Sequence, residues 1–443
     1  MGKTTVAVAL LAAWRQQGRR PAPFKAGPDY IDPGLHAQAA GRPSRNLDVW
    51  LLDEPALMGV LGRGMREADV AVIEGVMGLY DGIGATQEAS SASLARTLAC
   101  PVVLVLDVAA MSGTAAALAL GCQRMQPGVQ LAGVVLNRVG SDGHLKATAD
   151  AIRAATGLPV LGSLPDDAEL AVPERHLGLV PSAEGGISGR TLDRLADLVR
   201  QRFDLEALWR IAASAPALAE ADLPQAEPLP TGPRIAVAQD RAFGFYYEDT
   251  FDVLRDAGAE IVPFSPLEDG ELPPDTHGVY LGGGFPELYA AMLAANARMR
   301  AALQCHARLD RPIYAECGGL MALGRTLTTF EGETLPMLGL LPLDSHMQRK
   351  TLTIGYREVE ALRPTPLMTA GSRVRGHEFH WSLADAPTAR LAAYRVTGTD
   401  RLEGFCVGST LGSYVHLNFA GAPDLARRLV ASCAQGTRPR RGS

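Results

Sequence analysis

Continuous apolar segments recur between helical stretches in the first half of the chain, and this alternation restricts the fold more than any other feature. The four segments are 68–75, 101–108, 131–138 and 159–165. Strands that are apolar throughout are buried on both faces, and their alternation with helices is typical of a parallel sheet covered on either side. We therefore predict an α/β fold in which ligands bind at the carboxyl ends of the strands.

The chain begins with MGKTTVAVALL, which is similar to the second half of a phosphate-binding loop. Gly2, Lys3, Thr4 and Thr5 precede or open an amphipathic helix, and in a complete GxxxxGK[ST] loop the backbone N–H groups surround phosphates. The preceding strand and the first glycine of the loop are missing, so we expect the true start to lie upstream. By itself GKTT is a weak signal, because any Lys-Thr pair at the start of a helix looks similar.

Polar residues follow several of the predicted strands. They are Lys25, Asp29, Asp32, Glu74, Asp81 and Asn137. A carboxylate opposite a phosphate-loop Thr can hold Mg²⁺ directly or through water, and an Asn amide suits an adenine edge. Each of these residues alone is explained as well by a turn or a helix cap. Three such strand ends beside part of a phosphate loop favour a site for ATP and magnesium.

A segment rich in proline and alanine, 212–233, separates the chain into two halves. It has no hydrophobic periodicity, so we interpret it as a linker. We predict a first domain at 1–190, a helix and linker at 191–232, and a second α/β domain at 233–430. The basic tail at 431–443 is interpreted as a solvated chain end.

In the second half, the segment RPIYAECGGLMAL places Cys317 between a short apolar strand and a helix-like run. Ala315 and Gly319, two positions before and after the cysteine, are small enough for a tight strand-to-helix turn. This is the cysteine counterpart of the nucleophile elbow, in which the helix N-terminus favours the thiolate and the next N–H can hold an oxyanion. A buried structural cysteine is the alternative, and the elbow alone does not decide between the two.

Two other segments could complete a site around Cys317. The strand beginning at 278 ends in three glycines, 282–284, whose backbone could supply a second oxyanion donor, with an ordinary tight turn as the alternative. His416 in GSYVHLNF is the candidate base, although a histidine in a strand is more often a packed core residue. His377 and His380 compete for that role, and their spacing does not match the HExxH zinc motif.

Composition excludes several classes of protein. The net charge of −6 argues against nucleic-acid and anionic-membrane partners. The length of 443 residues and the 47% hydrophobic content indicate a globular protein of two or three domains. Six scattered cysteines without a CxxC pair fit reduced thiols. Because the sequence also has neither a membrane-length apolar run nor a secretory leader, we expect a cytoplasmic protein.

Seven segments taken together resemble one family, the glutamine-dependent a,c-diamide synthases of cobalamin biosynthesis. They occur in the order GPDYIDP, EGVMGLYDG, LNRVGSDGH, AFGFYYED, YLGGGFPEL, ECGGLMAL and RGHEFHWS. The likeness runs from residue 2 to about residue 430. It implies an N-terminal P-loop, ATP-binding amidoligase domain similar to dethiobiotin synthetase, with its first strand missing. It also implies a C-terminal class I glutamine amidotransferase-like domain.

The resemblance implies a reaction and its participants. Cys317 would attack the glutamine amide with His416 as base, and the released ammonia would attack an acyl phosphate formed by ATP and Mg²⁺. That acyl phosphate would form on a carboxylate of a corrin, cobyrinic or hydrogenobyrinic acid, giving amides at positions c and a. The partners are then the corrin, L-glutamine and ATP, and a homodimer is common in such enzymes.

The resemblance also assigns the remaining site residues. These are Gly2, Lys3, Thr4, Thr5 and Asn137 for the nucleotide; Thr4, Asp29 and Glu74 for the metal; Asp32 and Asp81 for substrate or intermediate; and Gly283, Gly284 and Gly318 for the oxyanion. Many class I amidotransferases have a Glu two residues after the catalytic His. This chain has Asn418 there, so we expect a Cys–His dyad whose orienting group the sequence does not name.

Three alternatives remain beside this reading. Cobyric acid synthase and the nickel-sirohydrochlorin diamide synthase share the architecture. The segments GPDYIDP and EGVMGLYDG favour the a,c-diamide synthase over cobyric acid synthase. The Arg/Ala-rich composition gives no support to the nickel-sirohydrochlorin enzyme. A partition-type P-loop switch fused to an inactive amidotransferase-like module would have lost its nucleophile, whereas Cys317 and His416 are both present. Whether the corrin carries cobalt is not determined by the sequence.

Overall fold

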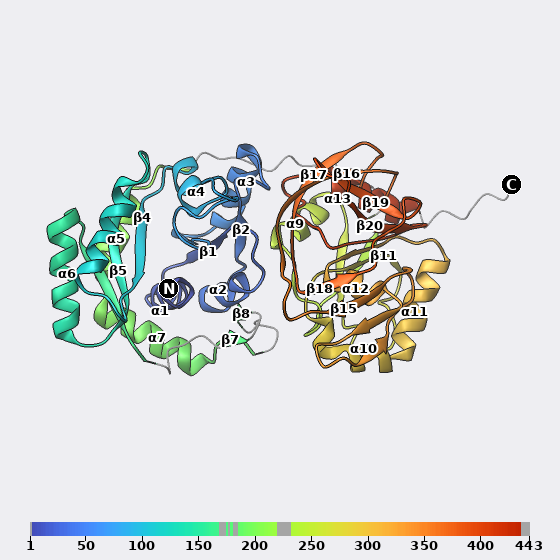
Figure 1. Ribbon diagram of the computed structural model, residues 1–443, viewed down its shortest axis with the longest axis horizontal. Coiled ribbons are helices and arrows are strands. Elements are labelled where there is room, and N and C mark those ends of the chain that lie inside the picture. Colours follow the sequence, from blue (N-terminus) through green and yellow to red (C-terminus); the bar gives the residue numbers. More distant parts are fainter. Residues whose placement is uncertain (1, 168–173, 176–177, 180–184, 219–231, 436–443) are drawn as a thin grey trace. The chain divides into compact units, whose positions relative to one another are not determined.

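The computed structural model describes residues 2–167, 174–175, 178–179, 185–218 and 232–435 (Figure 1). The chain divides into two compact units, Met1–Asp222 and Leu223–Ser443. Part of the predicted linker, 219–231, and most of the predicted basic tail, 436–443, lie outside the described residues. Among the helices that the structure describes, none is long and apolar enough to cross a lipid bilayer.

The first unit alternates strands and helices, as predicted. Its elements are α1 (Lys3–Gln16), β1 (Pro21–Ala26), α2 (Asp32–Ala40), β2 (Arg45–Leu47), α3 (Glu54–Met65), β3 (Val70–Glu74), α4 (Ser91–Thr97), β4 (Val102–Asp107), α5 (Gly113–Arg124), β5 (Leu131–Val139), α6 (Asp142–Thr156), β6 (Val160–Pro165), β7 (Glu174–Arg175), β8 (Gly178–Leu179), α7 (Gly189–Arg202) and α8 (Leu205–Ala213). Each of the four predicted apolar segments contains one strand of a parallel sheet.

The parallel strands form two separate three-stranded sheets, β2-β1-β3 and β4-β5-β6. In the described part of the chain, β3 and β4 are edge strands that do not pair with each other, and no strand precedes α1. The first sheet aligns Lys25 of β1 with Glu74 of β3, which brings both side chains to the carboxyl end of the sheet.

Helix α1 lies at the centre of the core of the first unit. Its small residues Val8, Ala9 and Ala13 are fully buried, and the same cluster includes residues of α2, α7 and the strands β3 and β5. Small side chains let neighbouring elements approach closely, so the start of α1 is held firmly against the strand ends. The edge of the Trp14 ring contacts Trp209 of α8, with ring centroids 5.8 Å apart.

The second unit is built around a mixed sheet. Its elements are β9 (Arg234–Ala238), α9 (Glu248–Asp256), β10 (Glu260–Phe264), β11 (Thr276–Leu281), η3 (Pro286–Tyr289), α10 (Ala290–Ala295), α11 (Ala297–Arg308), β12 (Ile313–Glu316), α12 (Gly318–Leu323), β13 (Thr326–Thr328), β14 (Thr334–Pro336), β15 (Asp344–Met347), β16 (Thr353–Ala361), β17 (Arg373–His380), β18 (Ser382–Ala384), β19 (Ala392–Val396), β20 (Leu402–Val407), β21 (Thr410–Ser413), β22 (His416–Leu417) and α13 (Asp424–Gln435).

The ten strands of this sheet follow the order β10-β9-β11-β12-β21-β20-β19-β16-β17-β22. The strands from β10 to β21 pair in parallel, and the remaining pairs are antiparallel. A second, four-stranded sheet has the order β14-β13-β15-β18. Strand β12 belongs to the parallel part of the main sheet, and at its carboxyl end it leads into the turn before α12, where Cys317 lies.

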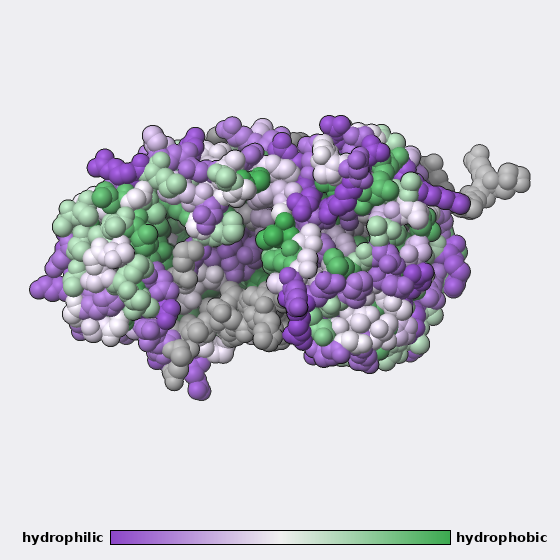
Figure 2. All heavy atoms as spheres, in the orientation of Figure 1, coloured by the Kyte–Doolittle hydropathy of each residue, from purple (hydrophilic) through white to green (hydrophobic). Residues whose placement is uncertain are grey.

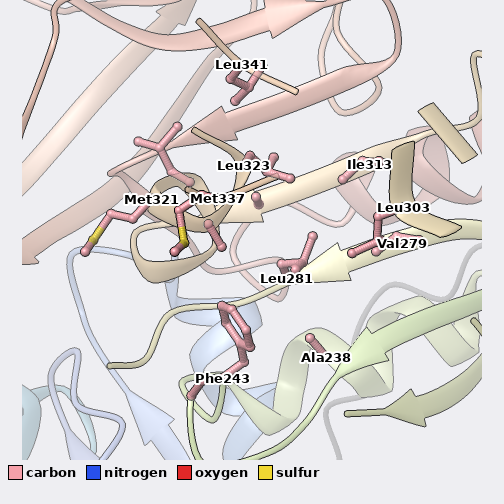
Figure 3. Packing of buried hydrophobic residues seen from close by; sticks show 14 of the residues in the cluster. Ala238, Phe243, Val279, Leu281, Leu303, Ile313, Met321, Leu323, Met337 and Leu341 are labelled. Atoms are coloured by element: carbon pink, nitrogen blue, oxygen red, sulfur yellow. The ribbon is translucent and has the colours of Figure 1, made fainter. Parts of the chain in front are cut away.

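Apolar side chains from both sides of that turn form the core of the second unit (Figure 3). Leu281 of β11, Ile313 of β12 and Leu323 of α12 are each at most 1% exposed. Burying a side chain of this size stabilises the fold by about 2 kcal/mol, so β12 and α12 are fixed on both sides of the cysteine. On the face shown in Figure 2, hydrophilic and hydrophobic residues are intermingled over each unit.

Candidate functional site

Cys317 lies on a tight turn between the end of β12 and the start of α12. Its backbone φ is 47° and ψ is −101°, a conformation that is strained for a residue other than glycine. The turn is fixed on both sides, because Cys317 N–H donates to Ser413 O at 2.8 Å and Gly319 N–H donates to Gly282 O at 3.0 Å. A Cβ atom on Gly319 would lie 2.3 Å from Leu281 O. The strand-to-helix turn therefore requires a residue without a side chain two positions after the cysteine.

His416 begins β22 and is buried beside Cys317. Burial by itself lowers the pKa of His416, but hydrogen bonds to the side chains of Cys317 and Glu316 outweigh this effect and raise the pKa to about 10. His416 Nδ1 lies 3.5 Å from Glu316 Oε2. The raised pKa keeps the His416 ring positively charged at neutral pH, between the Cys317 sulfur and the Glu316 carboxylate.

Glu316 faces His416 Nδ1, and sequence reasoning missed this residue. Its carboxylate is 1% exposed and accepts hydrogen bonds from Tyr280 Oη at 3.1 Å, from the Tyr314 hydroxyl and from Leu417 N–H at 3.0 Å. A buried carboxylate needs such partners, because an isolated charge in the interior is strongly unfavourable. One feature of the sequence could have indicated Glu316: it is an acidic residue at the end of a buried apolar strand, directly before the candidate nucleophile.

The predicted oxyanion glycines lie around the same turn. A Cβ atom on Gly318 would be 3.0 Å from Gly284 N, and one on Gly283 would be 2.7 Å from His416 Cε1. Gly284 has a φ of 156°, and a Cβ there would lie 2.0 Å from Ala242 O. Outside helices and strands, neither Gly284 N–H nor Gly318 N–H donates to a backbone carbonyl in the described part of the chain.

In the first unit, the start of α1 meets the carboxylates that follow β1 and β3. Thr4 Oγ1 donates to Glu74 Oε1 at 2.8 Å and lies 3.5 Å from Asp32 Oδ2. Gly2, which precedes the helix, has a φ of 78°, and Thr5 lies in the first turn. The predicted phosphate-loop threonine and two of the predicted carboxylates therefore share one cluster.

Lys25 lies at the centre of this carboxylate cluster. Its Nζ is 2.9 Å from Glu74 Oε1 and 3.6 Å from Asp29 Oδ2, and it also donates to Asp32. Burial lowers the pKa of Lys25, but the three carboxylates raise it overall. The ammonium ion is thus the internal counter-ion of the cluster.

The pKa values of two carboxylates in the cluster are shifted in opposite directions. Burial, with Asp29 and Glu74 nearby, raises the pKa of Asp32 to about 7. Burial also acts to raise the pKa of Glu74, but hydrogen bonds from His36 and Lys25 lower it to about 2. His36 Nε2 lies 2.5 Å from Glu74 Oε2, and sequence reasoning missed this histidine because its partner is 38 positions away.

Asp29 and Asp81 act in part as turn residues. Asp29 Oδ1 accepts hydrogen bonds from the N–H groups of Ile31 at 2.8 Å and of Asp32 at 3.1 Å, while its other oxygen faces Lys25. Asp81 Oδ2 accepts a hydrogen bond from Gly78 N–H at 2.8 Å. Both residues thus act as turn residues, as the sequence allowed. Asp29 also lies beside Lys25, and the charge of Asp81 acts on Lys3.

Lys3 and Asn137 also adjoin the start of α1. Burial and the charge of Lys25 lower the pKa of Lys3, against the opposing effects of Glu74, Asp32 and Asp81. Asn137, near the end of β5, is 8% exposed. A Cβ atom on Gly2 would lie 2.0 Å from Asn137 Nδ2, so the amide packs directly on the loop residue before the helix.

Comparison with known proteins gives two domain matches along the chain and several curated relatives. The model described as the CobQ/CobB/MinD/ParA nucleotide binding domain matches residues 1–180, and the CobB/CobQ-like glutamine amidotransferase domain matches residues 234–423. Cobyrinate a,c-diamide synthases from Dehalococcoides mccartyi strain CBDB1 and from Salmonella typhimurium strain LT2 are each 42% identical over 439 residues, which is 97% of this chain and 95% of theirs. The chain belongs to the cobyrinate a,c-diamide synthase family.

Membership of the cobyrinate a,c-diamide synthase family confirms the predicted family and the predicted fold class, with a nucleotide-binding domain before a glutamine amidotransferase domain. It also confirms the prediction of a carbon–nitrogen ligase that uses glutamine. The structure gathers the predicted residues of this family member into two clusters, one in each unit. The roles of the individual residues in both clusters stay predictions.

Proposed function

We propose that the chain catalyses the ATP- and glutamine-dependent amidation of the a and c carboxylates of cobyrinic acid. The observation that carries this proposal is the buried Cys317–His416–Glu316 arrangement in a family member that covers its relatives almost completely. An inactive amidotransferase-like module would not need a strained cysteine hydrogen-bonded to a charged histidine. The arrangement supports an active glutaminase.

The glutaminase reaction follows from the contacts of Cys317. Cys317 would attack as the thiolate beside the His416 imidazolium, and its sulfur forms a bond to the amide carbon of glutamine. The N–H groups of Gly284 and Gly318 would hold the resulting oxyanion. The carbon–nitrogen bond then breaks as the imidazolium gives its proton to the nitrogen, which leaves as ammonia. The neutral His416 ring then takes a proton from water as the water oxygen attacks the thioester, which releases glutamate and restores the thiolate and the imidazolium.

Glu316 supports this cycle without reacting itself. Because it accepts three hydrogen bonds and faces His416 Nδ1, it keeps the opposite edge of the ring available to Cys317. A carboxylate in this place stabilises the imidazolium and fixes the orientation of the ring. Glu316 is therefore proposed as the group that orients His416, for which the sequence offered no candidate because Asn418 stands two residues after the histidine.

In the first unit, the start of α1 is proposed to bind the phosphates of ATP. The N–H groups following Gly2, the Lys3 ammonium and the hydroxyls of Thr4 and Thr5 would face the phosphates, and Asn137 would contact the adenine. Asp32 and Asp81 would contact the substrate carboxylate or its acyl phosphate. Ammonia would attack that acyl phosphate, with release of phosphate and formation of the amide.

The residues present fit a magnesium ion. Thr4, Asp29 and Glu74 would supply oxygen ligands, which Mg²⁺ prefers, and Thr4 Oγ1 is 2.8 Å from Glu74 Oε1. No group of three or more His, Cys, Asp or Glu side chains suited to a metal occurs among the described residues. This is compatible with an ion that keeps several waters and takes few protein ligands. When bound, Mg²⁺ neutralises charge on the transferred phosphate.

Two further expectations belong to this proposal. The described cysteines are all free thiols, which supports a reducing cytoplasm as the place of action. A homodimer is expected because such enzymes are commonly dimeric, and sedimentation of the purified chain tests it. A sedimentation coefficient of a 46.8 kDa monomer at working concentration would contradict it.

A mass-resolved turnover assay tests the proposed function. The purified chain is given ATP, Mg²⁺ and glutamine, with cobyrinic acid in one tube and hydrogenobyrinic acid in the other. A diamide in the first tube is the expected result. A diamide formed faster in the second tube would make the metal-free corrin the substrate, and no product in either tube from folded protein would overturn the proposal.

A further inference from the structure

A second histidine lies directly against His416 and takes no part in the proposed chemistry. His377 of β17 is the antiparallel cross-strand partner of His416 in β22. Their rings are stacked, with centroids 5.0 Å apart and planes inclined by 18°. Both side chains are almost completely buried. The face of the proposed base is therefore covered by another imidazole ring.

The strand that carries His377 is pressed closely onto the site. A Cβ atom on Gly376, the residue before it, would lie 2.4 Å from His416 O, so the two strands approach as closely as glycine allows. Further along the same strand, Phe379 O accepts a hydrogen bond from Cys317 Sγ at 3.8 Å. The strand thus contacts both members of the proposed catalytic pair, and the height of His377 above His416 is fixed by the backbone.

Tyr247 contacts the ring of His377 at its Nδ1 atom. Its hydroxyl lies 3.2 Å from His377 Nδ1, and the tyrosine is 2% exposed at the start of α9. Burial lowers the pKa of His377 well below its ordinary value, and the charge of His416 lowers it further. A neutral, flat ring therefore lies against a charged one. Such stacking is favourable and excludes water from the face of the imidazolium.

We propose that His377, held by Tyr247, is a positioning residue that keeps the His416 ring in the plane where it meets both Cys317 and Glu316. This inference rests on the proposed glutaminase role of Cys317 and His416. Without the stacked ring, His416 could rotate about its side-chain bonds and lose one of its two partners. A displacement of about 1 Å at a catalytic group can slow a reaction by roughly a hundredfold.

The test compares glutamine hydrolysis in His377→Ala, His377→Phe and Tyr247→Phe variants of the full chain. We expect His377→Ala to lower kcat by about ten- to a hundredfold while the KM for glutamine and the ammonia-dependent activity stay within twofold. His377→Phe keeps a flat ring and should recover most of the lost kcat. His306→Ala, which removes another buried histidine on α11, is the matched control for general destabilisation.

A wild-type kcat in His377→Ala would overturn the proposal, and so would a His377→Phe variant as slow as His377→Ala. If His377→Ala also loses ammonia-dependent activity, its fold is damaged. In that case the Tyr247→Phe variant tests the positioning role instead. A lowered kcat supports this role, and an unchanged kcat contradicts it. Cys317→Ala separates the two proposals: retained glutaminase activity in that variant refutes the proposed function, whereas a normal kcat in His377→Ala refutes only the positioning role.

Discussion

Replacing Glu316 with Gln removes one negative charge beside His416 while keeping the shape of the side chain. The separation of 3.5 Å between Glu316 Oε2 and His416 Nδ1 gives a charge–charge attraction of about 5 kcal/mol at an effective dielectric constant of about 20. At about 1.4 kcal/mol per pKa unit, this corresponds to roughly 3 units. The pKa of His416 should therefore fall well below its value of about 10 in the unchanged chain.

The ionised pair of Cys317 and His416 then loses its advantage at neutral pH. We expect alkylation of Cys317 by iodoacetamide at pH 7 to slow by about tenfold or more, and glutamine hydrolysis to slow with it. The ammonia-dependent reaction should be unchanged, because it bypasses the cysteine. The rate of alkylation is measured by mass spectrometry of the cysteine peptide across pH 5–10.

Glu403 provides the matched control for this change. It is also a buried carboxylate, and it accepts hydrogen bonds from the Ser413 hydroxyl and from Tyr414 N–H at 2.9 Å rather than facing His416. Glu403→Gln should leave the alkylation profile of Cys317 in place. If Glu316→Gln alkylates and hydrolyses glutamine within twofold of the unchanged chain, the orienting role assigned to Glu316 is wrong.

Three other outcomes are expected. Cys317→Ala should abolish glutamine use but retain amidation with free ammonia, followed by product mass; loss of both in folded protein would mean a structural cysteine. Glu74→Gln should lower ATP-dependent turnover by at least about tenfold and spare glutaminase activity, measured separately; normal turnover contradicts its role. The pKa of His416 is higher in the folded chain than in the unfolded chain, so protonated His416 stabilises the fold fully below about pH 6.5 and this stabilisation is lost as the pH rises towards 10. His416→Gln should therefore reduce the decline of Tm between these pH values.

Local sequence determined the parts of this protein that depend on neighbours along the chain. The apolar segments fixed the strands, since a fully buried strand needs apolar residues on both faces. Cys317 between a strand and Gly318-Gly319 determined the turn, because the backbone at Gly319 leaves no space for a side chain. The long motifs determined the family, and with it the order of the two domains.

Only the tertiary structure decided which distant residues meet. Glu316 accepts a hydrogen bond from Leu417 N–H across 101 positions, and Tyr247 meets His377 across 130. Nothing in the spacing of a sequence specifies which strands become neighbours or in what register, and a slip of one residue would turn His377 to the opposite face of the sheet. The sequence therefore indicated the proposed nucleophile and its proposed base, whereas strand pairing brought Glu316, His377 and Tyr247 next to them.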